Sequence, residues 1–362
     1  MRDCVLLLPG DLDTPTGGYR YDRRLAGELR ALGWQVQVAS LGGEYPWPDA
    51  QARARAEDTV ASLPAGALVV ADGLAFGALP EVALRHADRL RWVALVHHPL
   101  GLETGLDPAA AAALVDSERR ALAAARRIVV TSEATAGLIA HLGLAGHRGP
   151  GCVTVIEPGC DVAAPAQPPA TQRDPDPAPV TRLLCVASVT PRKGHRALLQ
   201  ALAPLAGLRW ALHCVGSLTM DPREAAAARD AAVALGLHER VHWYGAVEAE
   251  ALPAHYDRAD LFVLPSLFEG YGMVVAEALA HGLPVLASDT GAARELLAGG
   301  GGLCLPPGDV AAWHAALSSL LAEPSRRARM RADALRVRAR LPSWRSAAAR
   351  WDELLRRTSA GR

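Results

Sequence analysis

The fold class is decided by residues 261–287, which read LFVLPSLFEGYGMVVAEALAHGLPVLA. The apolar, strand-type run 261–265 leads into a loop that contains glycines, and a helix is expected over 273–281. A second strand-type run follows at 284–287. A strand, a crossing helix and another strand in about thirty residues predict one βαβ unit of a parallel sheet.

The same alternation of short apolar runs with helical stretches extends along the whole chain. In the first half we expect strands at 4–9, 35–39, 68–71, 93–97, 128–131 and 153–156, with helices at 18–32, 108–125 and 133–141. In the second half we expect strands at 182–187, 210–215, 241–243, 261–265 and 284–287, with helices at 194–203, 223–235, 252–258, 273–281 and 310–321. This pattern predicts the α/β class, with two doubly wound, Rossmann-like domains.

Length and composition indicate where these domains divide. A chain of 362 residues exceeds the roughly 250–300 residues at which a single core stops growing. Six prolines between residues 164 and 179 exclude regular structure there. We therefore predict an N-terminal domain at 1–164, a proline-rich linker at 165–180, a C-terminal domain at 181–341 and a last helix at 342–362.

The charge balance excludes two classes of protein. With 38 basic and 38 acidic residues the formal net charge is zero, so neither a polycation that binds nucleic acid nor a disordered chain is expected. No apolar stretch reaches the roughly 20 residues of a spanning helix, and the N-terminus lacks the cleavage site of a signal peptide. We expect a cytoplasmic protein whose six scattered cysteines stay reduced.

Arginine is concentrated in residues 324–362, where twelve arginines stand against three acidic residues. Two interpretations are open: a peripheral contact with the anionic inner face of a membrane, or a solvated helical face. In both, side chains such as Arg327 are expected to be exposed. Among all the basic residues of the chain, only Lys193 is a lysine.

Glycines and acidic residues follow the first expected strand at its carboxyl end, where α/β sheets bind ligands. Residues 9–19 read PGDLDTPTGGY. Gly17 and Gly18 open a helix whose bare amides and dipole would favour an anion, and a tight turn with positive φ is the alternative. Asp11 and Asp13 resemble a metal-binding D-x-D pair, but they follow the first strand of a two-domain pattern, so no metal site is expected.

Two further strand ends supply candidate side chains. His97 and His98 lie where the strand 93–97 ends, and they could form hydrogen bonds or shuttle protons. Ser132 follows the strand 128–131, where it would either cap the next helix or contact a ligand.

The loop within residues 261–287 combines acidic side chains with bare amides. Gly270 and Gly272 would let amides at the helix start close on phosphate oxygens, and Glu269 and Glu277 flank them. This arrangement predicts an anion site between two carboxylates.

A second helix start, earlier in the same half, carries positive charge. Arg192 and Lys193 follow the strand 182–187 and stand at the beginning of the next expected helix. Their charges would suit the phosphates of a diphosphate.

These residues together resemble the E-x7-E signature of the family 4 retaining glycosyltransferases, which have the GT-B fold. The signature is carried by Ser266, Glu269, Gly270, Tyr271, Gly272, Glu277, Ala278, Gly282, Pro284 and Val285. Fragments in the family's order are found at 17–18, 97, 157–161, 193–194, 245–247, 291–295 and 306–309. The resemblance implies two Rossmann-like domains facing a cleft, with the last helix crossing back to the first domain.

The resemblance also implies a role for each matching residue. Catalytic roles are implied for His97, Glu269 and Lys193. Donor binding is implied for Gly17, Gly18, Arg192, Lys193, Val247, Gly270, Tyr271, Gly272, Met273 and Glu277. Contacts with the sugar or the acceptor are implied for Tyr19, His98 and Ser132, and no metal ligand is implied. The sequence departs from the family at Ser188, because many members carry an arginine about five residues before the lysine.

The activity implied is transfer of a hexosyl-type sugar, with retention, from a nucleotide diphosphate sugar to an acceptor that the sequence does not identify. A front-face substitution without a metal is expected, with a UDP- or GDP-sugar as co-substrate and no other cofactor. Two alternatives stay open: a nucleotide-sugar epimerase or hydrolase of the same fold, and a non-catalytic nucleotide-sugar-binding protein. Cations and helix amides at the diphosphate favour transfer, because negative charge grows there as the bond breaks.

Overall fold

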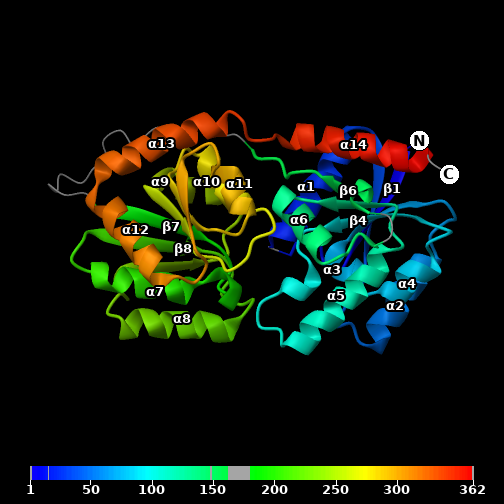
Figure 1. The fold of residues 1–362 in the computed structure, drawn as a ribbon, viewed down its shortest axis with the longest axis horizontal. Coiled ribbons are helices and arrows are strands. Elements are labelled where there is room, and N and C mark those ends of the chain that lie inside the picture. Colours follow the sequence, from blue (N-terminus) through cyan, green and yellow to red (C-terminus); the bar gives the residue numbers. More distant parts are fainter. Residues whose placement is uncertain (1, 15, 147–148, 162–179, 361–362) are drawn as a thin grey trace. The chain divides into compact units, whose positions relative to one another are not determined.

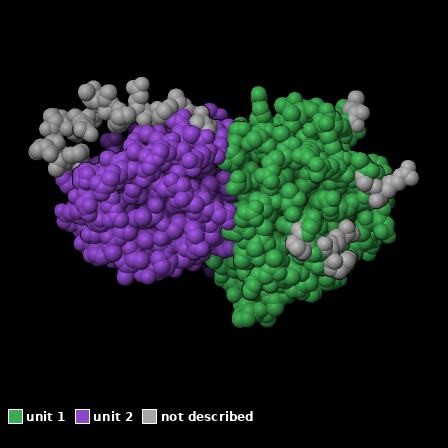
Figure 2. Space-filling view, turned by 45° about the horizontal axis from the view of Figure 1, so that its top comes forward, with its two compact units in different colours: residues 1–159, 342–362 green, residues 160–341 purple. Residues whose placement is uncertain are grey.

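A computed structural model of the chain describes every residue except 1, 15, 147–148, 162–179 and 361–362. The chain divides into two compact units, which Figure 2 shows in different colours. Unit 1 comprises Met1–Gly159 and Pro342–Arg362, and unit 2 comprises Cys160–Leu341. The predicted linker at 165–180 lies outside the described residues except for Val180.

Unit 1 is built on a parallel sheet of six strands: β1 (Arg2–Leu8), β2 (Trp34–Ser40), β3 (Leu68–Asp72), β4 (Arg91–Val96), β5 (Arg127–Val130) and β6 (Val153–Val155). Their order across the sheet is β2-β1-β3-β4-β5-β6. Figure 1 labels β1, β4 and β6 of this sheet. Its helices are α1 (Gly17–Ala31), α2 (Ala50–Ala61), α3 (Gly73–Phe76), α4 (Pro80–Arg85), α5 (Pro108–Leu122), α6 (Glu133–His141) and α14 (Trp344–Ala360). Val69, Ala94 and Val129 on the central strands are fully buried, as expected for a sheet covered on both faces.

Unit 2 repeats this architecture with strands β7 (Thr181–Val186), β8 (Trp210–Val215), β9 (Val241–Gly245), β10 (Leu261–Leu264), β11 (Val285–Ser288) and β12 (Gly302–Leu305). The strand order is β12-β11-β10-β7-β8-β9. The helices are α7 (His195–Leu202), α8 (Pro222–Ala234), α9 (Leu252–Arg258), α10 (Met273–Ala280), α11 (Ala292–Leu297), α12 (Val310–Ala322) and α13 (Pro324–Arg338). The α/β class with two doubly wound sheets is confirmed, and the six cysteines are free thiols as expected.

In each unit the strand order reverses at two neighbouring strands near the middle of the sheet. These strands are β1 and β3 in unit 1, and β7 and β10 in unit 2. Crossovers leave such a pair in opposite directions, so the loops at its carboxyl ends diverge and leave room for a ligand. The topology therefore points to the loops after β1, β3, β7 and β10.

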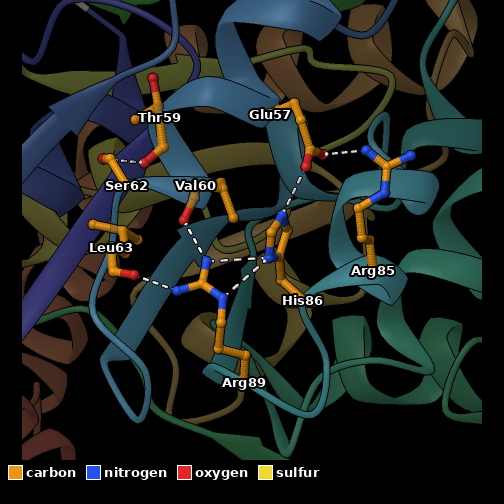
Figure 3. Close-up of polar contacts among 8 residues, drawn as sticks. All are labelled: Glu57, Thr59, Val60, Ser62, Leu63, Arg85, His86 and Arg89. Carbon is orange, nitrogen blue, oxygen red and sulfur yellow. Dashed lines mark hydrogen bonds and ion pairs between the residues drawn. The ribbon is translucent and has the colours of Figure 1, made fainter.

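The sequence analysis missed helices α2, α3, α4 and α11 and the edge strand β12. Contacts distant in sequence hold α2 in place (Figure 3). Arg89 donates to the carbonyls of Val60, over 2.7 Å, and of Leu63 at the end of α2. Arg89 also donates to His86 Nδ1 over 3.1 Å, and His86 Nε2 lies 2.9 Å from Glu57 Oε1. A network of this kind leaves no local sequence pattern that would predict the helix.

The arginine-rich tail forms two helices that pack in different units. Helix α13 buries Met330, Ala334 and Val337 in unit 2. Helix α14 buries Trp351 in unit 1, where its indole donates to the Tyr21 hydroxyl over 2.7 Å. These apolar side chains are thus covered by protein, whereas Leu335 of α13 is exposed.

The expectation that Arg327 is exposed is wrong. Its side chain is half-buried, and its guanidinium donates to the carbonyls of Leu320 and Leu321 at the end of α12. Cations near a helix C-terminus stabilise its bare carbonyls, which explains the position of this arginine. Within the described part of the chain, every helix is too short or too polar to span a membrane.

Candidate active site

The loops after β7 and β10 are joined by hydrogen bonds in unit 2. The Leu267 amide donates to the Arg192 carbonyl over 2.7 Å, and Arg192 Nη1 donates to the Phe268 carbonyl over 3.0 Å. Lys193 Nζ donates to Glu269 Oε1 over 2.6 Å. The two loops that the sequence analysis singled out are therefore in direct contact at the point where the strand order reverses.

Two glycines permit the conformation of these loops. Gly194, with φ of 70°, precedes α7, and a Cβ atom there would lie 2.2 Å from the carbonyl oxygen of Pro265. Gly272, with φ of 83°, is the N-cap of α10. Residues other than glycine rarely adopt such φ values, so both positions require glycine.

The electrostatics of the Lys193–Glu269 pair favour its charged form. Burial would raise the pKa of Glu269, but the charges of Lys193 and Arg192 and the hydrogen bond from Lys193 lower it below its usual value. The side chains of Lys193 and Glu269 are 17% and 11% exposed, so both are largely withdrawn from water. A carboxylate held ionised here can accept hydrogen bonds from hydroxyl groups while the ammonium meets an anion.

His195, next to this pair, is a weaker base than an ordinary histidine. It is buried at the start of α7, with Nε2 3.7 Å from Cys185 Sγ. Burial and the charge of Lys193 lower its pKa to about 4, so the ring stays neutral near pH 7.

Glu277 lies on the second turn of α10 and is bound by a residue that the sequence analysis missed. The Tyr256 hydroxyl, from α9, donates to Glu277 Oε2 over 2.9 Å. The Tyr256 ring is 2% exposed and stacks on His281 with a centroid distance of 5.0 Å. His281 in turn lies 2.7 Å from Asp257 through Nδ1, so this network fixes the direction of the Glu277 carboxylate.

The other predicted donor-binding residues lie close by in sequence or structure. Tyr271 is buried beside Gly270, and Met273 begins α10. Val247 lies two residues beyond β9 and packs against the core of unit 2. Ser188, where many family members carry arginine, is half-buried two residues after β7.

Unit 1 brings a second group of side chains together after β1, β3 and β4. His97 directly follows β4, and its Nε2 lies 3.4 Å from Asp22 Oδ1 on α1 and 3.6 Å from Asp72 Oδ2 at the end of β3. Both aspartates are buried, whereas the His97 side chain is 22% exposed. The ligand atoms of these three side chains lie within 4.8 Å of one another and are of the types that bind divalent cations.

These groups change one another's acidity. Burial, together with the charge of Asp22, raises the pKa of Asp72 to about 7. Burial would lower the pKa of His97, but its hydrogen bond to Asp22 and the charges of both aspartates raise it above its usual value.

Gly17 and Gly18 are the first two residues of α1, so the alternative of a tight turn with positive φ is wrong. Thr16 caps the helix by accepting from the Tyr19 amide over 3.4 Å. Gly18 lies against the imidazole, because a Cβ atom there would be 3.5 Å from His97 Cδ2. Burial, with the charges of the nearby aspartates, raises the pKa of Tyr19 to about 12, so its hydroxyl keeps its proton.

The remaining candidates of unit 1 have protein partners. His98 Nε2 lies 3.8 Å from Glu103 Oε2. Ser132 is fully buried, and its hydroxyl accepts from the Thr135 amide as the cap of α6, so the capping alternative describes it. Asp13 is exposed and bound to Arg23 over 2.9 Å.

Comparisons with known proteins find sequences of glycosyltransferases similar to this chain. Residues 172–337 match the family model described as "Glycosyl transferases group 1". The chain is 32% identical over 243 residues to a D-inositol 3-phosphate glycosyltransferase of Corynebacterium efficiens, covering 62% of this chain and 55% of that protein. The chain is therefore similar in sequence to glycosyltransferases.

A second relative is a GDP-mannose-dependent alpha-(1-6)-phosphatidylinositol monomannoside mannosyltransferase of Mycolicibacterium smegmatis. It is 35% identical over 183 residues, which cover 48% of this chain and 47% of that protein. The chain thus spans about half the length of these curated relatives.

Solved structures of glycosyltransferases share the fold over nearly the whole chain. A sucrose-phosphate synthase from Thermosynechococcus elongatus superposes with a TM-score of 0.79 at 22% identity, covering 99% of both chains. The Anabaena protein HepE, in complex with UDP-glucose, gives a TM-score of 0.76 at 19% identity over 99% of this chain and 100% of that one. The GT-B fold expected from the sequence is therefore confirmed.

Proposed function

We propose that the chain is a family 4 retaining glycosyltransferase that moves a hexosyl residue from a UDP- or GDP-sugar to an acceptor hydroxyl without a metal ion. The observation that carries this proposal is the Lys193–Glu269 pair, in which Nζ lies 2.6 Å from Oε1 in the loop before α10. It joins a cation suited to a diphosphate with a carboxylate suited to sugar hydroxyls. Unit 2 would bind the donor, and unit 1 would bind the acceptor.

The chemistry follows from where charge grows. As the bond between the anomeric carbon and the diphosphate oxygen breaks, Lys193, Arg192 and the amides near Gly272 would stabilise the departing diphosphate. The acceptor oxygen bonds to the same face of that carbon, and its proton passes to the diphosphate oxygen that leaves. Glu269 would hold hydroxyls of the donor sugar, and Glu277 would hold the ribose.

The relatives narrow the substrates worth testing. One is named for D-inositol 3-phosphate and another for GDP-mannose and a phosphatidylinositol monomannoside. We therefore propose a polyol or a lipid-linked polyol as the acceptor class, with inositol 3-phosphate as the first probe.

An epimerase or hydrolase of this fold is the alternative enzyme, and a non-catalytic binding protein is the alternative class. Either would need the donor site of unit 2 without an acceptor. A non-catalytic binding protein would be expected to lack these charged side chains. The presence of Lys193, Glu269 and Glu277 therefore supports catalysis rather than binding alone.

Two measurements test the proposal. A thermal-shift screen of UDP-, GDP- and ADP-sugars should reveal one donor, because a ligand at 100 times its Kd adds about 2.7 kcal/mol of stability. The binding donor is then incubated with inositol 3-phosphate, and the product's anomeric configuration is read by NMR. Retention in a new glycoside supports the proposal; free sugar alone indicates a hydrolase, an epimerised donor an epimerase, and binding without turnover a binding protein.

A cytoplasmic location and a peripheral contact of α13 and α14 with anionic membrane stay predictions. Because most apolar side chains of both helices are buried, such a contact would rest mainly on exposed arginines. Flotation with anionic and neutral vesicles tests it, since an electrostatic contact would need anionic lipid and weaken with salt.

A further inference from the structure

Three elements of unit 1 converge on one nitrogen atom. Asp22 is supplied by α1, Asp72 by the end of β3, and His97 by the residue after β4. His97 Nε2 lies 3.4 Å from Asp22 Oδ1 and 3.6 Å from Asp72 Oδ2. Both carboxyl groups thus face the same edge of the imidazole ring.

The environment of the ring leaves its other nitrogen available. Carboxylate oxygens accept hydrogen bonds, so Nε2 carries the hydrogen in this arrangement. Among the described residues, His97 Nδ1 has no hydrogen-bond partner. The His97 side chain is 22% exposed, so a ligand can reach it.

The ring is also fixed from its sides. Tyr21 packs edge-on against it at a centroid distance of 5.1 Å, and the Tyr21 hydroxyl accepts from Trp351 of α14 over 2.7 Å. Gly18 lies close to its Cδ2 atom, at a position where any Cβ would be 3.5 Å away. These contacts restrict rotation of the ring, so the carboxylates act on a single orientation.

Burying these two carboxyl groups costs free energy unless their charge is compensated. Asp22 is 0% exposed and its Oδ2 has no hydrogen-bond partner among the described residues, while Asp72 uses one oxygen to cap α3 at the Leu74 amide over 2.8 Å. Two carboxyl groups this close, out of water, are stabilised by a proton or a cationic neighbour. His97 is the neighbour that can supply that charge.

We propose that Asp22 and Asp72 are positioning residues that hold His97 by its Nε2–H, fix the orientation of the ring and leave Nδ1 for a ligand. The inference rests on the proposed function only for what Nδ1 meets, which would be a hydroxyl of a substrate. A positively charged imidazole would donate a hydrogen bond to that hydroxyl.

The test reads His97 directly in the full chain without substrate. Long-range ¹H–¹⁵N NMR of histidine-labelled protein reports the tautomer and pKa of each ring, and His97→Gln assigns the signal among the twelve histidines. In the parent protein we expect the Nε2–H form above the titration and a pKa above the usual 6.5 or so. An Nδ1–H tautomer in the parent would overturn the proposal.

Neutral replacements of the carboxylates then separate positioning from mere packing. Asp22→Asn and Asp72→Asn keep the shape and an acceptor oxygen but remove an ionisable carboxyl group. The His97 pKa should fall in both, and by about 1 pH unit in Asp22→Asn, because Asp22 forms the hydrogen bond to Nε2. Asp116→Asn, at an exposed position on α5, is the matched control and should leave it unchanged. If the His97 pKa is unchanged in every cluster variant that folds, the proposal is overturned. If only one of the two variants folds, that variant decides.

Kinetics extend the test to the proposed transfer. In the cluster variants the activity of a catalysed transfer should begin to decline at a lower pH than in the parent. Absence of transfer with every donor would contradict the proposed function alone, because the tautomer and pKa of His97 are measured without turnover.

Discussion

Lys193 Nζ and Glu269 Oε1 lie 2.6 Å apart, although 76 residues separate them in the sequence. The pair joins the loop after β7 to the loop after β10, where the strand order of unit 2 reverses. Neither charge is fully hydrated, so each depends on the other and on whatever ligand enters.

Replacing the lysine should slow transfer more than it weakens donor binding. Lys193→Ala removes a cation that interacts more strongly as charge builds on the diphosphate, and loss of one such group typically costs about 10²–10³ in turnover, or roughly 2.7–4 kcal/mol. Lys193→Arg should restore only part of the rate, because a planar fork replaces a compact ammonium. Single-turnover rates and donor Kd measure the two effects separately.

The control for this lysine is Arg329→Ala, since Arg329 is exposed on α13 of the same unit. It should turn over like the parent. A folded Lys193→Ala variant with near-parental turnover and bound donor would show that Lys193 has no part in the chemistry.

The two glutamates should affect different steps, one donor binding and the other the rate of transfer. Glu277→Ala should chiefly raise the donor Kd, whereas Glu269→Ala should chiefly lower kcat, because only Glu269 is bound to the lysine at the leaving group. Calorimetry and steady-state kinetics check this. If both variants bound and turned over like the parent, the E-x7-E assignment would be wrong.

Tyr256→Phe should weaken binding of the donor, and only through its effect on Glu277. The change removes the hydroxyl that donates to Glu277 Oε2 and keeps the buried ring, so about 1 kcal/mol of donor affinity should be lost. Calorimetry with the nucleotide and its 2′,3′-dideoxy analogue measures it. The loss should vanish with the analogue, and an equal loss for both ligands would show that Tyr256 acts on something other than the ribose.

Transfer should survive exhaustive chelation, because Lys193 and helix amides replace a divalent ion at the diphosphate. Activity after EDTA and gel filtration should stay within about twofold of the untreated enzyme, a change below about 0.5 kcal/mol. Full loss that Mg²⁺ or Mn²⁺ restores would contradict this. In that case comparison of Asp22→Asn with Asp13→Asn would identify which acidic group binds the ion.

The buried Glu118 should make unit 1 less stable as the pH rises. Burial raises its pKa to about 8, and its Oε2 accepts from the Leu100 amide over 3.0 Å. Between about pH 4.5 and 8 the folded form keeps a proton that the unfolded form has lost. Its contribution to the free energy of unfolding therefore falls with pH, by at most about 1.4 kcal/mol per pH unit.

Glu118→Gln isolates this effect because it keeps an acceptor oxygen and removes the proton. Hydrogen exchange of peptides from β4 and β5, compared at each pH from 5 to 9, should show the variant gaining protection relative to the parent as pH rises. Asp116→Asn, exposed on the same helix, is the control. Parallel pH trends in parent and Glu118→Gln would rule out Glu118 as the source.

The sequence by itself determined the α/β class, the two sheets and most of their strands, because apolar runs alternating with helical stretches are a local signal. It also located the loop that carries Glu269 and Gly272, since a strand, a glycine loop and a helix lie within thirty or so residues there. Elements stabilised by distant side chains left no such signal, and α2, held by Arg89, is the clearest case.

Only the tertiary structure decided which groups touch. Asp22 and Asp72 lie 75 and 25 residues before His97, in a helix and a strand that read as ordinary core elements, yet they meet at its Nε2. Tyr256 reads as a core aromatic until its hydroxyl is seen on Glu277. Parallel strands bring their carboxyl ends together regardless of distance along the chain, and the order of those strands, which no local pattern encodes, selects the side chains that share a site.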